Sequence, residues 1–297
     1  MQHIILFLAF IAVNSLFAQS FKSPYDLSEP AAVYDLPEEL NEVSGIRLID
    51  DQRMVCIQDE LGEIFIYNLT SRSVTDRIPF GKDNDYEDVV VLNDDAFVLE
   101  SDGDIHIVRN FLDAEKRTVD KKETALEQEN NCEGLCYQAS THSLLIACKG
   151  RAGLDKDRDL DDYRAVYRFS IKDEELFEAP VMLVNINDLL DYSNLNIFAR
   201  LSYKLASRMD PNGDIRFQPS AIDIHPISGY IYITSFVGSL MAIYDENGYL
   251  LAAERLDRLI FMQPEGLDFD EEGNMYISNE SNGGQANILL FEYQETN

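Results

Sequence analysis

A short phrase recurs along the 297-residue chain at a nearly constant interval. Each copy has a polar first residue, a small residue or Asp at the second position, and an aliphatic third residue. The five copies are Ser44-Gly45-Ile46, Glu87-Asp88-Val89, Glu133-Gly134-Leu135, Ser220-Ala221-Ile222 and Glu265-Gly266-Leu267. Their first residues are 43, 46, 87 and 45 positions apart. A period in the forties, in which each copy opens a strand-and-turn unit, is typical of a β-propeller.

The segments after each phrase alternate apolar strands with polar turns, and most units contain four such strands. The last unit has only three predicted strands, whereas segment 32–36 is a predicted strand without a unit of its own. Because a propeller avoids exposed sheet edges by closing its ring, we expect 32–36 to be the outer strand of the last blade. The sequence therefore predicts an all-β fold, a five-bladed β-propeller, with 19–297 as a single domain.

The 87-residue interval between the third and fourth copies is close to two periods and leaves two alternatives open. One is a sixth blade, and the other is an inserted helical segment near 187–216. From Ile197 to Met209 the apolar residues follow a helical rather than an alternating spacing, and Asp188 is a suitable helix cap. The spacing favours the helical insertion.

The first eighteen residues contain no Lys, Arg, Asp or Glu and include a mostly apolar run that ends at Ala18. Such a run is short for a bilayer span and is typical of a secretory signal peptide, residues 1–18, with cleavage after Ala18. An uncleaved amino-terminal anchor is the alternative. We therefore expect a periplasmic or extracellular protein, membrane-associated only if that segment is retained, and no spanning segment in the mature chain.

The formal net charge of −30 excludes some partners. Nucleic acid and anionic lipid both require a basic face, so neither is an expected partner. The charge is compatible with a solubilising acidic surface and with cation binding.

The four cysteines, Cys56, Cys132, Cys136 and Cys148, do not by their spacing require a disulfide. An exported protein permits disulfides. Cys132 and Cys136 would lie roughly 13 Å apart in one strand, which is beyond disulfide reach. Cys136 and Cys148 are predicted small core residues.

The propeller symmetry brings the first residues of the phrases together at one mouth of the central channel. Each phrase would begin the innermost strand of its blade, and the period-2 alternation keeps the next residue away from the axis. Like carboxylates that converge must be protonated or hold a cation, and Ca²⁺ prefers several oxygen ligands. The candidate metal ligands are Glu87, Glu133, Glu265, Ser44, Ser220 and Glu42, the last lying two residues before its phrase. The alternative is that these carboxylates bind backbone or basic groups within their own blades.

The second strand of each unit returns to the same mouth, and its end adds further polar groups. These include Asp59 and Glu280, which complete the set of candidate ligands. They also include Lys149, the only basic residue among these strand ends, which could neutralise Glu133. If the three glutamates share a site, at least one should have a raised pKa, and cation binding should release protons.

Signatures of catalysis are few. No nucleophile-elbow Ser, paired-His zinc motif or phosphate-binding glycine loop is present, so no catalytic residue is predicted. The acidic run from Asp155 to Asp162 lacks the Gly at the sixth position and the Glu at the twelfth position of an EF-hand. We expect a solvated loop there.

The ordered phrases resemble the SdiA-regulated (YjiK/CarP-like) family over about 32–293. The resemblance rests on 43–46, 86–88, 132–135 and 263–267, together with Gly273-Asn274-Met275-Tyr276-Ile277-Ser278-Asn279-Glu280. It implies an exported or envelope-associated propeller with links to calcium and no settled enzymatic activity. The chain departs from the family pattern at Asp88, where Gly is usual, at Ser220-Ala221, where Ser-Gly is usual, and in the long insert.

The sequence thus leads to one functional hypothesis and one alternative. The hypothesis is a calcium-binding, non-enzymatic envelope protein for sensing, homeostasis or contacts, with an envelope protein or a small ligand as a further partner. The alternative is a metal-dependent hydrolase, similar to lactonase or phosphoesterase propellers, that acts at the same mouth through a metal-activated water.

Overall fold

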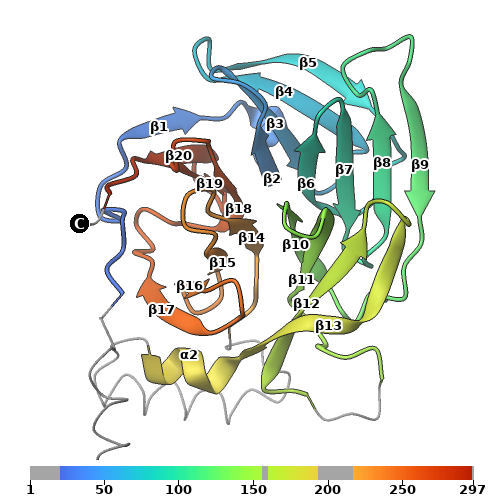
Figure 1. The fold of residues 1–297 in the computed structure, drawn as a ribbon. Coiled ribbons are helices and arrows are strands. Elements are labelled where there is room, and N and C mark those ends of the chain that lie inside the picture. Colours follow the sequence, from blue (N-terminus) through green and yellow to red (C-terminus); the bar gives the residue numbers. More distant parts are fainter. Residues whose placement is uncertain (1–20, 156–159, 193–216, 296–297) are drawn as a thin grey trace, which may run out of the picture.

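The computed structural model describes residues 21–155, 160–192 and 217–295. In this part of the chain, five four-stranded antiparallel sheets stand around one axis like blades (Figure 1). The predicted five-bladed β-propeller is therefore confirmed.

The strands follow one another from the axis outward in each of the first four blades. The first blade contains β2 (Val43–Leu48), β3 (Arg53–Gln58), β4 (Glu63–Asn68) and β5 (Ser73–Pro79). The second contains β6 (Tyr86–Leu92), β7 (Asp95–Glu100), β8 (Ile105–Arg109) and β9 (Thr118–Lys122). The third contains β10 (Cys132–Gln138), β11 (Ser143–Cys148), β12 (Tyr163–Ser170) and β13 (Glu175–Asn185). The fourth contains β14 (Ala221–Ile224), β15 (Ile231–Ser235), β16 (Leu240–Tyr244) and β17 (Leu250–Arg255).

The fifth blade joins the two ends of the chain. It contains β18 (Pro264–Phe269), β19 (Met275–Asn279) and β20 (Asn287–Phe291), and its outer strand is β1 (Ala32–Asp35). Strand β1 pairs with β20 from Ala32 opposite Leu290 to Asp35 opposite Asn287. The predicted closure by segment 32–36 is thus confirmed, one residue shorter. A short 3-10 helix, η1 (Glu38–Leu40), leads from β1 to the first blade.

The core consists of apolar layers between neighbouring blades. The third residue of each phrase is fully buried and lies in a different one of five apolar clusters; these residues are Ile46, Val89, Leu135, Ile222 and Leu267. Aliphatic residues at this position of every inner strand fit the pleated, buried surface between two sheets. The repeated phrase is therefore first of all a packing motif.

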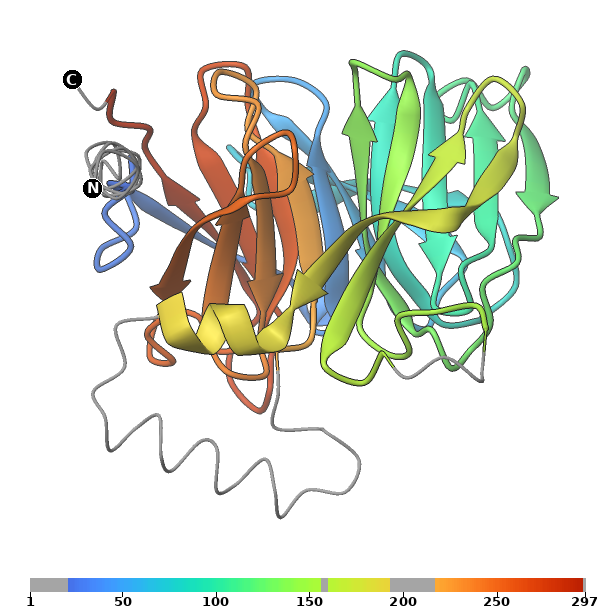
Figure 2. The ribbon, with the colours of Figure 1, turned by 60° about the horizontal axis from the view of Figure 1, so that its bottom comes forward.

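The long interval between the third and fourth copies begins with a helix, α2 (Ile186–Tyr192), beside the end of β17 (Figure 2). Its Ile186 and Leu189 are buried in the apolar cluster between the third and fourth blades. This helix agrees with the predicted start of a helical insertion, and the predicted remainder lies outside the described residues. Within the described ranges there is no sixth sheet, and no helix is long and apolar enough to cross a membrane.

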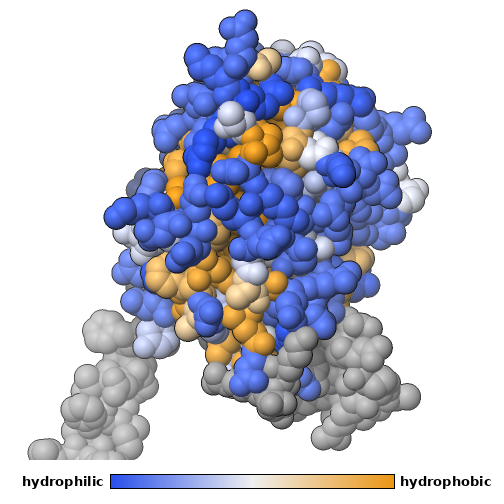
Figure 3. Space-filling model, turned by 90° about the vertical axis from the view of Figure 1, so that its right-hand side faces the viewer, coloured by the Kyte–Doolittle hydropathy of each residue, from blue (hydrophilic) through white to orange (hydrophobic). Residues whose placement is uncertain are grey.

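The outer surface on the side of β9 and β13 is largely hydrophilic, with apolar side chains exposed between the polar ones (Figure 3). The exposed large apolar residues of these two strands are Val119, Phe177, Val181 and Leu183. The predicted signal segment 1–18 and most of the acidic loop between Asp155 and Asp162 fall outside the described residues.

Candidate functional site

The three glutamates of the phrases lie at β-bulges in the inner strands of three blades. Tyr86 pairs with Glu100 and Asp88 pairs with Leu99, so Glu87 between them has no partner across the sheet. The register shifts in the same way around Glu133 and Glu265. A bulge leaves its extra residue unpaired and re-aims its side chain, which is common beside functional sites. The same β-bulge therefore orients the glutamate side chain in each of the three blades. Regular alternation, which the sequence predicts, does not describe these positions.

The charges of Glu87, Glu133 and Glu265, which we call the glutamate ring, act on one another. Burial raises the pKa of Glu87 well above its usual range, and Glu133 and Asp85 raise it further. Burial and the charge of Glu133 raise the pKa of Glu265 to about 8. Burial also raises the pKa of Glu133, although Lys149 opposes that shift. The three carboxyl groups are therefore near enough to raise one another's pKa values, in the direction expected for like charges.

Lys149 supplies positive charge to the glutamate ring. Its Nζ lies 2.9 Å from Oε1 of Glu133, as the sequence predicted, and Asn131 donates to the same oxygen at 3.0 Å. Burial would lower the pKa of Lys149, but Glu133, Glu265 and Glu87 raise it overall. One ammonium offsets one of three carboxylates, so full ionisation of the ring would leave it under-neutralised.

A second acidic group lies beside the ring, formed by Glu42, Asp59 and Glu280. Burial raises the pKa of Asp59 to about 7, with further contributions from Glu42 and Glu280. Burial and Glu42 likewise raise the pKa of Glu280, which accepts a hydrogen bond from the Gln263 amide. Oδ1 of Asp59 is buried and has no hydrogen-bond partner among the described residues. A buried carboxylate oxygen without a hydrogen-bond donor is uncompensated unless the carboxyl is protonated or binds a cation.

The approach to Asp59 is open. A hollow of about 520 Å³ is lined by Asp59, Glu60, Leu61, Asp83, Asn84 and Asp85. Four of these six side chains are acidic, so the hollow would attract cations and repel anions. We call the glutamate ring, the Asp59 group and this hollow the acidic mouth.

The two serines of the predicted site are buried and belong to the contacts between blades. The Ser220 hydroxyl donates to the Pro264 carbonyl at 2.6 Å, and the Ser44 carbonyl accepts from the Ser278 hydroxyl at 2.9 Å. The first bond joins the start of β14 to β18, and the second joins β2 to β19, so both connect the fifth blade to a neighbouring blade. The two serines therefore help to hold the blade that carries Glu265.

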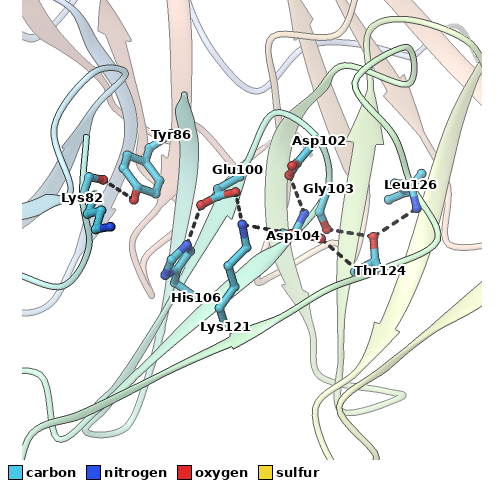
Figure 4. A network of polar contacts seen from close by, with 10 residues as sticks. All are labelled: Lys82, Tyr86, Glu100, Asp102, Gly103, Asp104, His106, Lys121, Thr124 and Leu126. Atoms are coloured by element: carbon cyan, nitrogen blue, oxygen red, sulfur yellow. Dashed lines mark hydrogen bonds and ion pairs between the residues drawn. The ribbon is translucent and has the colours of Figure 1, made fainter. Parts of the chain in front are cut away.

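Glu100, Asp102 and Asp104 form the only described set of three ligand-type residues whose ligand atoms all lie within 4.8 Å of one another. Figure 4 shows that basic groups already occupy it. Lys121 Nζ lies 2.6 Å from Glu100 and 3.0 Å from Asp104, and His106 Nε2 lies 2.6 Å from Glu100. These contacts lower the pKa of Glu100 to about 2 in spite of its burial. Lys121 therefore neutralises Glu100 and Asp104, and Asp102 accepts the Asp104 N–H at 3.1 Å.

A further charged cluster, which the sequence analysis missed, lies along the axis. Nη1 of Arg47 contacts Asp223 at 2.9 Å and Asp268 at 2.6 Å, and Asp88 acts on the same guanidinium. We call Arg47, Asp88, Asp223 and Asp268 the axial cluster. Its three aspartates are buried, with at most 5% of each whole residue exposed.

The carboxylates of the axial cluster connect neighbouring blades. Asp88 accepts the Leu135 N–H at 2.7 Å, which joins the second blade to the third. Asp223 accepts the Phe269 N–H, and Asp268 accepts the Leu48 N–H. These bonds join the fourth blade to the fifth and the fifth to the first. The axial cluster thus stabilises the ring of blades below the acidic mouth.

A signal for this cluster was present in the phrases. Arg47, Asp223 and Asp268 all stand at the fourth position of a copy, directly after the buried aliphatic residue. Asp88 stands where the family that the sequence resembles usually has Gly, and its packing against Gly45 explains how an Asp fits there. A Cβ on Gly45 would come within 2.3 Å of Oδ1 of Asp88, so the carboxylate occupies space that Gly45 leaves free.

No protein-family model and no curated protein sequence matches the chain. The solved structures that resemble it are β-propellers of low sequence identity. A glutaminyl cyclase from Myxococcus xanthus is 10% identical, with a TM-score of 0.55 over 91% of this chain and 97% of that one. A PQQ-bound aldose sugar dehydrogenase from Streptomyces coelicolor is 10% identical, with a TM-score of 0.50 over 89% and 97%. A virginiamycin B lyase from Staphylococcus aureus is 13% identical, with a TM-score of 0.45 over 88% and 73%. The likenesses to the cyclase and to the dehydrogenase support the fold alone.

Proposed function

We propose that the protein is an exported, calcium-binding propeller of the SdiA-regulated type, with a non-enzymatic role in sensing, homeostasis or contacts in the cell envelope. The acidic mouth is the calcium site. The observation that carries this proposal is the set of three glutamates from three blades that raise one another's pKa values and share the charge of one lysine.

The electrostatics favour a cation of double charge. Like carboxylates in a partly buried site destabilise one another's ionised form, and a cation relieves that repulsion. Calcium takes six to eight oxygen ligands from carboxylates, carbonyls and water, at flexible geometry. The glutamate ring offers carboxylates from three blades, and Asp59 offers an oxygen that has no hydrogen-bond partner in the described part of the chain. Calcium sites of extracellular modules have dissociation constants of about 10⁻⁴ to 10⁻³ M, and we expect this range here.

The proposed location depends on the amino-terminal segment and on the family resemblance. Residues 1–18 have the composition of a secretory signal, and the high acidity does not conflict with export. Mass spectrometry of secreted or periplasmic material should find a chain that begins at Gln19. A retained Met1 would instead favour the anchored form.

Thermal melting with and without Ca²⁺ tests the proposed cation site. A ligand that binds only the folded state stabilises it by about 2.7 kcal/mol at one hundred times its dissociation constant. We expect the midpoint to rise with calcium concentration in the wild-type protein, and the rise to be lost in Glu265→Gln. No calcium response in the wild-type protein would contradict the proposal.

Two variants sharpen this experiment. Glu271→Gln removes the same charge from an exposed residue of the turn after β18, away from the start of that strand, and should keep the calcium response. Lys149→Met removes the ammonium that competes for Glu133, and should strengthen calcium binding by about tenfold, or about 1.4 kcal/mol. Calcium- or zinc-dependent turnover of a lactone or phosphoester, abolished in Glu133→Gln, would replace this proposal by the hydrolase alternative.

A further inference from the structure

Two cysteines face each other directly below the acidic mouth. Cys132 is the first residue of β10 and Cys148 is the last residue of β11, and the two are opposite each other in the strand register. Both are fully buried in the same apolar cluster, so their side chains lie on the same face of the sheet. Their Sγ atoms are 3.6 Å apart.

The backbone at this position suits a cross-link. Directly opposite residues of antiparallel strands have Cα atoms about 4.5 to 5.5 Å apart, within the range of about 4.4 to 6.8 Å found in disulfides. Closing the gap between the sulfur atoms therefore requires side-chain adjustment without separation of the strands. Cys56 lies in the cluster between the first and fifth blades, and Cys136 lies in the cluster between the third and fourth blades. Cys132 with Cys148 is the pair that the fold brings together.

We propose that Cys132 and Cys148 form a disulfide when the chain folds in an oxidising medium. A thiolate of one cysteine attacks a small-molecule or protein disulfide and releases one thiol from it. The second thiolate then displaces the other half of the oxidant, so that one S–S bond forms in the chain and the oxidant leaves as two thiols. Because both sulfur atoms are fully buried in the folded protein, the exchange takes place before the third blade is packed.

The cross-link would act where the glutamate ring is built. Cys132 directly precedes Glu133, and Cys148 directly precedes Lys149. A bond between the two cysteines would hold together the strand ends that carry this ion pair. The β-bulge between Cys132 and Gly134, which contains Glu133, would then begin at a cross-linked residue.

Refolding the full chain in a mixture of oxidised and reduced glutathione tests the proposal. After unfolding and alkylation with iodoacetamide, intact mass should show two adducts on the four cysteines, and four adducts after prior reduction. Cleavage after Tyr137 should leave two peptides joined through Cys132 and Cys148. The cross-linked form should melt about 5 °C higher than the reduced form.

Two variants separate this pair from the other cysteines. Cys136→Ala removes a buried thiol of the same strand and should leave the cross-link intact, with one adduct. Cys132→Ala should give three adducts. Four adducts on the refolded wild-type protein, or a cross-link that includes Cys56 or Cys136, would overturn the proposal. The wild-type masses decide the matter even if a variant does not fold.

Discussion

Replacing Arg47 by Met should destabilise the protein strongly, because Arg47 is the one guanidinium of the axial cluster. Its side chain is 13% exposed and contacts Asp223 and Asp268, which are 7% and 1% exposed. Met has a similar length and no charge. The substitution therefore removes two charge-assisted contacts and leaves the buried carboxylates without their counter-charge.

The size of the effect follows from the two contacts. Hydrogen bonds to charged groups contribute about 1.5 to 3 kcal/mol each, and breaking a buried ion pair costs about 3 to 5 kcal/mol. We expect the free energy of unfolding at about pH 7 to fall by about 4 kcal/mol, with a midpoint about 10 °C lower. Arg53→Met is the matched control, because Arg53 pairs with Asp50 at 2.6 Å but the two side chains are 43% and 41% exposed. That variant should lose less than about 1 kcal/mol.

The loss in Arg47→Met should depend on pH. Burial raises the pKa of Asp268 to about 7 even though Arg47 opposes the shift. Without Arg47 the folded-state pKa values of Asp268 and Asp223 rise further above their unfolded values. A raised carboxyl pKa means that the folded state binds protons more tightly, so stability is present at low pH and is lost as pH rises towards the folded-state pKa. Asp268 is largely protonated below about pH 7 even with Arg47 present, so the loss should grow chiefly as pH rises from about 7 to about 9.

Urea unfolding followed by circular dichroism measures these differences, since the chain contains no Trp for fluorescence. Asp268→Asn in the Arg47→Met background should recover part of the loss, because it removes one of the unpaired charges. A loss no larger than that of Arg53→Met, or one that does not grow between about pH 7 and about pH 9, would refute the assignment of Arg47 as the counter-charge of the axial cluster.

Three further predictions concern other parts of the ring. Asp88→Ala removes the acceptor of the Val89 and Leu135 N–H groups and should lower the free energy of unfolding in urea by about 1 to 3 kcal/mol. Asp88→Asn keeps one acceptor and should lower it less. Equal losses for the two variants would argue against the hydrogen bond between the blades. Gly266→Ala would place a Cβ 2.6 Å from the Ser44 carbonyl oxygen and should lower the free energy of unfolding by about 1 to 3 kcal/mol. Gly284→Ala is the control, because its Cβ would be 3.3 Å from the nearest atom, and it should cost less than about 1 kcal/mol. Similar unfolding midpoints for the two variants would contradict the close packing at Gly266. Without calcium, the thermal midpoint should fall as pH rises from about 5 to about 8, because the folded-state pKa values of Asp59 and Glu265 are raised to about 7 and about 8. A midpoint that is constant over this pH range would refute the raised pKa values.

The ring of blades was predictable because its signal is repeated. A polar first residue and an aliphatic third residue recur in all five copies, and the unpaired segment at 32–36 has one free sheet edge to fill. The interval of 87 residues is explained in part by α2, which starts at Ile186. Strand bounds are weakly marked where a strand is exposed, as in β9 (Thr118–Lys122), because four of its five residues face solvent and show no apolar alternation.

The site was predictable only in part, because side-chain direction and neutralisation depend on three-dimensional contacts. The mutual effect of Glu87, Glu133 and Glu265 and the contact of Lys149 with Glu133 were predictable from the repeated phrases and the return of the second strand. The sequence did not predict the bulges, because a register shift arises between two strands and has no local sequence mark here. It also did not pair Cys132 with Cys148, since that pairing depends on the register of β10 with β11.

The central claim is that the glutamate ring exchanges protons for a divalent cation. Calorimetric titration of the metal-free protein with Ca²⁺ at about pH 7, in two buffers of different ionisation enthalpy, measures this exchange. Because the pKa of Glu265 is raised to about 8, binding should release protons, so the heats should differ between the buffers. The difference should shrink in Glu265→Gln and persist in Glu271→Gln. Equal heats in both buffers, or no binding, would contradict the claim.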